Sequence, residues 1–209
     1  TIQQSNNPTI QQSNNPTIQQ SNNPTIQQSN NPTIQQSNNP TMISFETERL
    51  LFREFTTNDG AFVFELMNSE GWLNYIGDRH VKSIPDAEAY IEEKYLPSYE
   101  LNGYGAYIVI LRETGIAVGS CGLYKRENLE HPDLGFAFQT EYVGKGYGFE
   151  ASKGVMQHAK KVCGINIILG VTMRENTPSI RLLEKLGLKE KGPFFFNDTS
   201  EELVLFSNE

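Results

Sequence analysis

The first forty residues of this chain are five identical copies of the octapeptide TIQQSNNP, and this repeat confines any folded domain to the residues C-terminal to it. Each copy holds one apolar side chain, an isoleucine, among polar and proline positions. Such a segment buries too little apolar surface to offset the entropy lost on ordering, and it lacks the apolar face of a solenoid repeat. We expect residues 1–41 to be a disordered tail, with a Gln/Asn-rich self-association segment as the alternative.

Met42 stands just after the repeats and ahead of the first expected strand. Because the copies show no drift, they resemble a tandem duplication of DNA that is read through. Our hypothesis is that translation starts at Met42. Residues 42–209 have the length of one domain with one core.

Several classes of protein are disfavoured by composition. The sequence has no apolar run of about eighteen residues, as a membrane span would need, and no segment with the pattern of a signal peptide. Cys121 and Cys163 suit buried free thiols rather than a disulfide framework, and no Cys/His cluster predicts a metal site. We therefore expect a cytoplasmic protein that binds neither membrane nor metal.

The net charge of −8 is distributed unevenly. Residues 142–191 hold nine Lys/Arg and four Glu, a balance of +5, so the rest of the chain carries −13. The basic segment suits an anionic ligand and the remainder suits a cationic one. Because acids interrupt the basic segment, nucleic acid is not the expected partner.

The folded part predicts alternating strands and helices. We expect an opening strand over 46–55, helices over 58–68 and 83–102, a hairpin about Glu113-Thr114-Gly115, a strand over 133–138, a helix from Tyr147 to Val162, a buried strand over 165–171, a helix opening at Thr177-Pro178 and closing at Gly187, and a last strand over 201–207. In the strand over 133–138, one face carries Leu134, Phe136 and Phe138 and the other carries Asp133, Gly135 and Ala137. Thr177 is the expected cap of its helix, with Pro178 at the first helical position. The strand, helix and buried strand from 133 to 171 form a right-handed βαβ unit. The fold class is α/β or α+β with a mixed sheet.

The most informative segment is Val143-Gly144-Lys145-Gly146-Tyr147-Gly148, between an expected strand and helix. Its glycines let a ligand approach the backbone. The N–H groups of the first helical turn lack internal partners, and the helix dipole favours negative charge there. The segment thus predicts a pyrophosphate site, to which Lys145 adds a positive side chain.

Other interpretations of this segment are less favoured. A plain glycine-rich turn between strand and helix stays open. A Walker P-loop is excluded because GxxxxGK[ST] is absent. A dinucleotide site would need an acidic residue about twenty positions further on, and Gly164 to Leu169 contain none.

Three stretches resemble the GNAT superfamily of N-acetyltransferases, in the branch that includes ribosomal-protein N-terminal acetyltransferases. DLGFAFQTEYVGKGYGFEA (133–151) resembles its strand, pyrophosphate loop and helix. ENTPSIRLLEKLGL (175–188) resembles its second motif, and TERLLFREF (47–55) resembles the first strand of the branch. The resemblance spans 42–209.

The resemblance implies a mostly antiparallel mixed sheet with helices on both faces and a splayed parallel strand pair that binds CoA. It implies that acetyl-CoA is the co-substrate, with its pantetheine arm on the main chain of Ala137 and Phe138 and its pyrophosphate on the amides of Gly144, Lys145, Gly146, Tyr147 and Gly148. Asn176 and Ser179 would lie near the pantetheine and the thioester. Helix capping is the alternative role for both.

Two positions depart from the family's pattern. Val143 replaces a common Gln or Arg, which removes one side-chain contact with the pyrophosphate. Leu183 replaces a Tyr that is often assigned as the acid that protonates the CoA thiolate. Because a thiol with a pKa near about 8.5 departs with little assistance, we expect the second departure to be tolerated.

Acetyl transfer to an amine also needs a base, because amines are mostly protonated at neutral pH. Asp133 is the first candidate base, with an ordinary exposed Asp as the alternative, and His131 is a weaker candidate. Ser179 could donate a hydrogen bond to the sulfur, and a backbone N–H near Phe138 could meet the oxyanion. Trp72, Tyr75 and Phe194–Phe196 line the acceptor side or form core or lid.

The expected function is acetyl-CoA-dependent N-acetylation of a primary amine, by direct attack, on a protein N-terminus or a small molecule. The alternatives are an acyl-CoA-binding module without turnover and, less favoured, an oxidoreductase. The negative charge outside 142–191 predicts a cationic acceptor.

Overall fold

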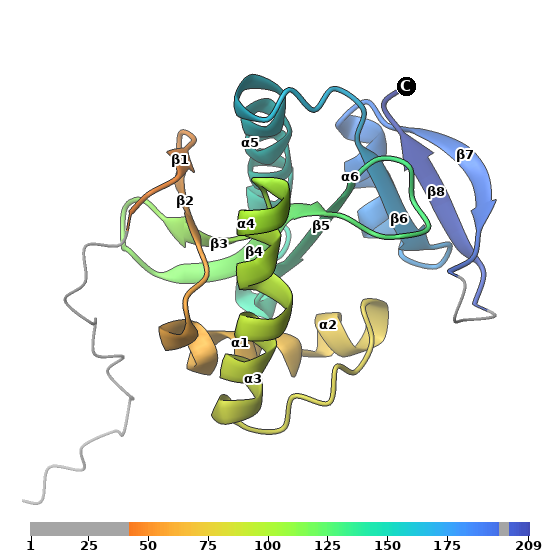
Figure 1. Ribbon diagram of the computed structural model, residues 1–209. Coiled ribbons are helices and arrows are strands. Elements are labelled where there is room, and N and C mark those ends of the chain that lie inside the picture. Colours follow the sequence, from red (N-terminus) through yellow and green to blue (C-terminus); the bar gives the residue numbers. More distant parts are fainter. Residues whose placement is uncertain (1–41, 197–200) are drawn as a thin grey trace, which may run out of the picture. The chain divides into compact units, whose positions relative to one another are not determined.

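A computed structural model describes residues 42–196 and 201–209, so the predicted disordered tail lies outside the described residues (Figure 1). Its centre is an eight-stranded mixed sheet in the order β1-β2-β3-β4-β5-β6-β8-β7, in which β5 and β6 are parallel and the other neighbours antiparallel. The strands are β1 (Phe45–Glu46), β2 (Leu50–Glu54), β3 (Ala106–Leu111), β4 (Ala117–Tyr124), β5 (Asp133–Phe138), β6 (Leu169–Met173), β7 (Lys189–Phe194) and β8 (Leu203–Ser207).

Helices cover both faces of the sheet, as predicted. The helical elements are η1 (Thr57–Asp59), α1 (Gly60–Met67), α2 (Glu70–Tyr75), α3 (Ile84–Tyr90), η2 (Ile91–Tyr95), α4 (Leu96–Asn102), η3 (Thr140–Tyr142), α5 (Tyr147–Val162) and α6 (Thr177–Lys185). Within residues 42–196 and 201–209, no helix combines the length and apolar character that a membrane crossing needs.

Two apolar clusters lie on opposite faces of the sheet, and strand β3 alternates between them. Tyr107 and Val109 pack in the cluster that contains the buried side chains of α5 and α6, whereas Ala106 and Ile108 pack in the cluster formed with α1, α2 and α3. This alternation follows from the two-residue period of a strand. The sheet therefore separates an α5/α6 face from an α1–α4 face.

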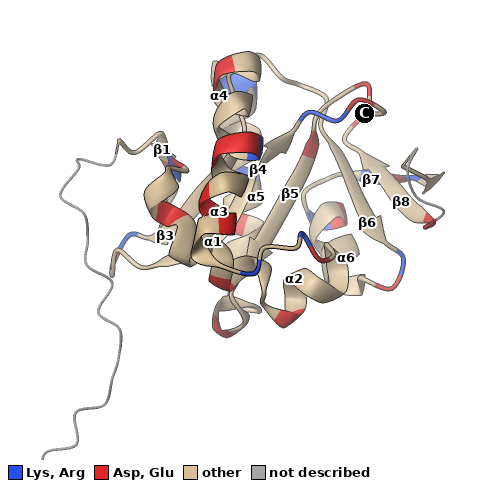
Figure 2. Cartoon of the chain, turned by 60° about the horizontal axis from the view of Figure 1, so that its bottom comes forward, with Lys and Arg blue, Asp and Glu red and all other residues tan. Residues whose placement is uncertain are grey.

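The parallel pair β5–β6 is open. Its ladder contains a single registered pair, Asp133 with Leu169, although each strand has five or six residues. Beyond this point the two strands diverge (Figures 1 and 2). The splayed parallel pair expected from the sequence is therefore present, closed at Asp133 and open toward Phe138.

The helix predicted over 83–102 is confirmed, although it has an irregular centre. Ser83 caps it by accepting a hydrogen bond from the Asp86 backbone N–H at 3.3 Å, and Gly103 ends it at φ +73°. A wide turn of π-helix over Ile91–Tyr95 precedes Pro97, which has no N–H to continue the regular ladder.

The predicted hairpin, the strand over 133–138 and the helix from Tyr147 to Val162 are also present. The buried strand begins later than predicted, at Leu169 rather than Ile165. The reason is that the Asn208 side chain binds the backbone before it, accepting from Ile168 N at 2.8 Å and donating to Asn166 O at 2.9 Å. The predicted opening strand is divided by a turn at Thr47–Arg49, and β7 and α2 were not predicted.

Candidate active site

The glycine loop lies at the open end of the splayed pair, between β5 and α5. Gly144 and Gly146 have φ of +79° and +83°, in the left-handed region that other residues rarely adopt. Gly146 is the N-cap of α5, so the first N–H groups of that helix face outward without intrahelical partners. A Cβ on Gly144 would meet no atom within 4 Å, so space remains beside the loop. The conformation of the loop is compatible with a pyrophosphate, and the binding role of its residues stays a prediction.

The other predicted loop residues have different roles. Lys145 is exposed, and its ammonium lies 5.2 Å from the centroid of the Tyr142 ring. Gly148 serves helix packing, because a Cβ there would lie 3.1 Å from Leu182 Cδ1 of α6. Val143 is 63% exposed and contributes no polar group to the loop.

Arg49 braces this loop and was not predicted. Its Nε donates to Glu150 Oε2 at 2.6 Å, its Nη1 donates to the Lys145 carbonyl at 3.3 Å, and its charge centre lies 4.6 Å from the centroid of the Tyr147 ring. Burial alone would raise the pKa of Glu150, but hydrogen bonds from Arg49 and Thr47 lower it below its usual range. No local signal could have found Arg49, because it lies about a hundred residues before the loop.

Asn176 caps helix α6, which corrects the prediction that Thr177 does so. Its Oδ1 accepts a hydrogen bond from the Ser179 backbone N–H at 3.2 Å, and Thr177 is already helical. Pro178 therefore occupies the second position of the first turn, where its missing N–H has no cost. The Asn176 amide nitrogen and the half-buried Ser179 hydroxyl make no hydrogen bond to the described residues, so the cap leaves both groups open to a ligand.

Leu183 is a core residue. It is 1% exposed, and a Cβ on Gly170 of β6 would lie 2.7 Å from its Cδ2. The Leu183 side chain therefore packs against strand β6.

The face of the sheet that packs against α1–α4 carries the candidate catalytic carboxylate, that of Asp133. Register between β4 and β5 pairs Tyr124 with Asp133 and Ser120 with Ala137, and Gly135 lies between them. The predicted alternation holds, because Leu134, Phe136 and Phe138 pack in the opposite cluster. The residues on this face are therefore Ser120, Tyr124, Asp133, Gly135 and Ala137.

Asp133 is buried, which rules out the exposed alternative. It is 2% exposed, and its Oδ1 accepts from Arg126 Nε at 2.7 Å. Burial raises its pKa above the usual range, and the Arg126 guanidinium opposes part of that rise. Arg126 was missed because nothing in the sequence pairs it with Asp133. His131 is half-buried on the preceding loop and forms no hydrogen bond to the described residues.

The aromatic residues expected on the acceptor side differ in how far they are buried. Trp72 is 6% exposed in the core, and its Nε1 has no hydrogen-bond partner among the described residues. Tyr75 is 44% exposed at the end of α2. Phe194 and Phe196 stack edge to face at 5.1 Å.

The two cysteines also differ. Cys121 is buried and burial raises the pKa of its thiol to about 12. Cys163 is partly exposed, so the prediction that both thiols are buried was wrong for this residue. It caps the C-terminus of α5, where that helix reaches the surface.

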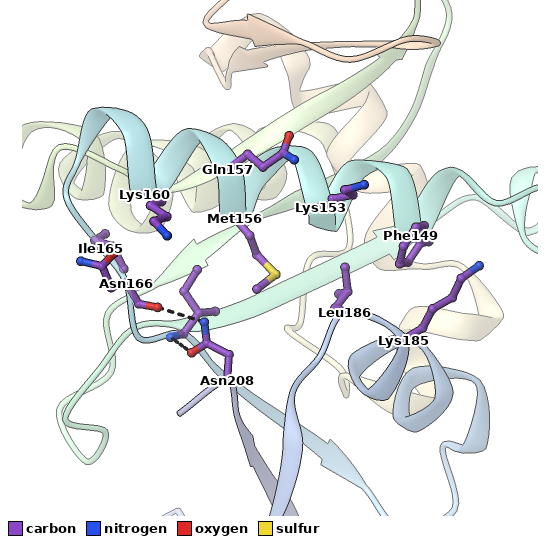
Figure 3. A pocket seen from close by; sticks show the side chains of 11 residues that line it. Phe149, Lys153, Met156, Gln157, Lys160, Ile165, Asn166, Lys185, Leu186 and Asn208 are labelled. Carbon is purple, nitrogen blue, oxygen red and sulfur yellow. Dashed lines mark hydrogen bonds between the residues drawn. The ribbon is translucent and has the colours of Figure 1, made fainter.

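Two hollows adjoin helix α5. One, of about 520 Å³, extends from Gly146 along α5 and is lined by three basic residues and three acidic ones: Arg49, Lys153, Lys185, Glu46, Glu48 and Glu150. The other, of about 360 Å³, continues along α5 to Lys160 and is shown in Figure 3. Phe149, Lys153, Gln157 and Lys185 line both, and none of the described residues that line the second is an acid. The second hollow is therefore basic, whereas the charges around the first are balanced.

A mixed sheet opened at one parallel pair, with a glycine loop and a helix N-terminus at the open end, is the architecture that the resemblance to the GNAT superfamily implied. Residues 49–189, more than half of the chain, match the family described as Acetyltransferase (GNAT) domain. The chain belongs to this family and is an acetyltransferase enzyme.

Known relatives agree with this assignment. The chain is 29% identical over 148 residues to the uncharacterized N-acetyltransferase YnaD of Bacillus subtilis, covering 71% of this chain and 84% of the relative. A GNAT-family acetyltransferase from Bacillus anthracis shares its structure with a TM-score of 0.64 at 25% identity, covering 79% of this chain and 96% of the other. RimL, a ribosomal L7/L12 alpha-N-protein acetyltransferase solved with coenzyme A, shares the fold with a TM-score of 0.68 at 13% identity, covering 79% and 97%.

Proposed function

We propose that this enzyme transfers the acetyl group of acetyl-CoA to a primary amine by direct attack of the amine on the thioester. The observation that carries the proposal is the position of the Gly144–Gly148 loop at the open end of the β5–β6 gap. The pyrophosphate would receive the free N–H groups at the start of α5. The pantetheine arm would follow β5 past Phe138 and Ala137.

The charge around α5 supports an anionic co-substrate. Lys153, Lys160 and Lys185 line the hollow without acidic residues, whereas in the hollow that begins at Gly146 the basic residues are balanced by Glu46, Glu48 and Glu150. None of the three lysines along α5 and α6 that line the hollows (Lys153, Lys160, Lys185) forms an ion pair with a described carboxylate. The proposal places the nucleotide end of acetyl-CoA on this face.

For the chemical step, we propose that Asp133 accepts the amine proton and that Ser179 donates a hydrogen bond to the sulfur. The nitrogen–carbon bond forms as the carbon–sulfur bond breaks, the amine proton passes to Asp133, and the thiolate leaves hydrogen-bonded to Ser179 and takes a proton from water. The raised pKa of Asp133 makes its carboxylate a stronger base than an ordinary aspartate. Asn176, whose Oδ1 accepts a hydrogen bond from the Ser179 backbone N–H, would hold the pantetheine with its amide nitrogen.

The proposed acceptor is cationic. Residues 57–103, which form η1, α1, α2, α3, η2 and α4, contain nine Asp/Glu and three Lys/Arg. Acidic side chains recur along these helices on the acceptor side of the sheet (Figure 2). This field would attract an ammonium ion toward Asp133. The two free thiols fit a reducing compartment, so the proposal places the reaction in the cytoplasm.

Two measurements test the proposal. Acetyl-CoA at a hundredfold excess over its Kd should stabilise the fold by about 2.7 kcal/mol, and an equal concentration of NAD should not. Release of free thiol in the presence of amines should then show turnover. Stabilisation without thiol release across a broad amine panel would favour the acyl-CoA-binding module instead, since Val143 and Leu183 depart from the family's pattern.

A further inference from the structure

The guanidinium of Arg126 is held from several sides at the acceptor face. Its Nε donates to Asp133 Oδ1 at 2.7 Å, and the Asp133 side chain is only 3% exposed. Its charge centre lies 5.7 Å from the centroid of the Tyr124 ring and 5.1 Å from that of the Phe196 ring. The Arg126 side chain is still 37% exposed, so one direction remains open to a ligand.

The two terminal nitrogens of Arg126 are available in that direction. Among the described residues, none accepts a hydrogen bond from Nη1 or Nη2, because the bond to Asp133 uses Nε. A guanidinium fork matches the two oxygens of a carboxylate in a planar pair of hydrogen bonds. Since Asp133 and two rings already restrict this side chain, binding costs it little further conformational entropy.

Arg126 lies at the closed end of the gap between β5 and β6. Its partner Asp133 forms the single registered pair with Leu169 that closes the gap. The Tyr124 ring beneath the guanidinium covers Gly135, where a Cβ would come within 2.6 Å of Tyr124 Cε2. At about 3.3 Å per residue, Asp133 is about 17 Å along the strand from Phe138. An arm that enters beside Phe138 would thus present its acyl end toward Arg126 and Asp133.

The indole N–H of Trp72, near the same face of the sheet, also lacks a hydrogen-bond partner among the described residues. Trp72 is 6% exposed, it belongs to the same cluster as Tyr124 and Ala137, and its Nε1 donates to no described residue. A buried donor without an acceptor is costly. An acceptor molecule with oxygen atoms would remove that cost.

We propose that the acceptor carries a carboxylate close to its amine, as an α-amino acid does, and that Arg126 is the residue that selects it. The proposal rests on the proposed acetyl transfer and names its substrate class. Arg126 binds the carboxylate through Nη1 and Nη2, while Asp133 faces the amine with Oδ2, which lies outside the ion pair. The guanidinium and carboxylate side by side are complementary to the adjacent opposite charges of an amino acid. A basic amino acid satisfies both this requirement and the acidic field of the surrounding helices.

The test compares α-amino acids with their decarboxylated amines, for example lysine with cadaverine, by thiol release at saturating acetyl-CoA. For at least one α-amino acid, the wild-type protein should show a kcat/KM at least tenfold above its kcat/KM for the corresponding decarboxylated amine. Arg126→Lys keeps a positive charge beside Asp133 but removes the planar fork. It should lower kcat/KM for the α-amino acid at least tenfold more than kcat/KM for the amine, since any effect that acts through Asp133 is common to both substrates. Arg112→Lys is the matched control, because Arg112 pairs with Glu46 at the far edge of the sheet.

Other outcomes separate this proposal from the acetyl transfer on which it rests. A protein that releases thiol from acetyl-CoA with simple amines but prefers no α-amino acid over its decarboxylated amine overturns the carboxylate proposal alone. An Arg126→Lys variant that loses both substrates equally also overturns it. Failure of the wild-type protein to bind acetyl-CoA overturns the proposed function and this proposal together.

Discussion

Glu150 on helix α5 and Arg49 in the turn between β1 and β2 form an ion pair with a nitrogen–oxygen distance of 2.6 Å. The same arginine binds the carbonyl of Lys145, inside the glycine loop. The turn after the first strand thereby braces the segment proposed to bind the pyrophosphate. Because a preorganised site loses less entropy on binding, this pair should affect affinity more than stability.

Arg49→Ala should therefore weaken acetyl-CoA binding. Removing the Lys145 hydrogen bond and one positive charge near the loop should cost about 1 kcal/mol, or roughly a fivefold rise in Kd. Titration calorimetry with acetyl-CoA measures this change. Lys191→Ala removes an exposed positive charge from the edge strand β7, so it is the control and should leave the Kd unchanged. Equal effects of the two variants would mean that Arg49 contributes general charge rather than loop geometry.

Glu150→Gln should change how stability depends on pH. The pKa of Glu150 lies below its ordinary value of 4.5, so its ionised form stabilises the fold above that pH. This contribution is lost as the pH falls through the lowered pKa. The wild-type protein should melt higher than the variant at pH 7, and the difference should shrink toward pH 3. A difference that stays constant over this range would show that the carboxylate's charge plays no part.

Gly146→Val should abolish stabilisation by acetyl-CoA. A β-branched side chain resists φ of +83° and would occupy the approach to the first N–H groups of α5. Gly103→Val provides a matched control, because Gly103 has φ of +73° and its carbonyl contacts Cys163 at the opposite end of α5 from Gly146. Both variants should lose melting temperature, but Gly103→Val should retain its acetyl-CoA shift. If Gly146→Val also retains it, the loop does not bind the co-substrate.

Much of the fold could be predicted from local patterns. The glycines of the loop, the helix from Tyr147 and the alternation of Leu134, Phe136 and Phe138 follow from backbone conformation and strand period. The delayed start of β6 could not be predicted, because it depends on Asn208, about forty residues away. A near-continuous aliphatic run does not reveal which of its backbone groups another side chain will bind.

The same distinction between local patterns and distant partners applies to the candidate site. The loop could be proposed from the sequence because its expected binding groups are backbone N–H groups at contiguous positions. Arg126 and Arg49 were not, because their roles depend on partners that the sheet brings together. The cap of α6 was misassigned between Asn176 and Thr177, since both residue types can cap and only geometry distinguishes them.

A chain that begins at Met42 should keep the melting temperature and acetyltransferase activity of the full chain. The physical reason is that the TIQQSNNP repeat offers no continuous apolar face to pack against residues 42–209. Differential scanning calorimetry and thiol release on both chains measure the effect. A loss of several degrees in the shorter chain would show that the repeat contributes contacts, and the read-through hypothesis would then be withdrawn.

The acceptor rate should depend on acceptor charge and on salt. Residues 57–103 carry six more acidic than basic side chains, and they form the helices on the acceptor side of the sheet. An acidic field raises the local concentration of a cation, and added salt screens it, because the Debye length falls from about 30 Å at 0.01 M to about 10 Å at 0.1 M. With acetyl-CoA saturating, kcat/KM for a basic amino acid should fall several-fold over that range. For a neutral amino acid it should stay nearly constant, and for an acidic one it should rise.

This ordering separates the field of the helices from the contact with Arg126, since all three acceptors carry the same α-carboxylate. Equal rates for the three acceptors, without salt dependence, would show that the net charge of −6 on residues 57–103 plays no part in the choice of acceptor.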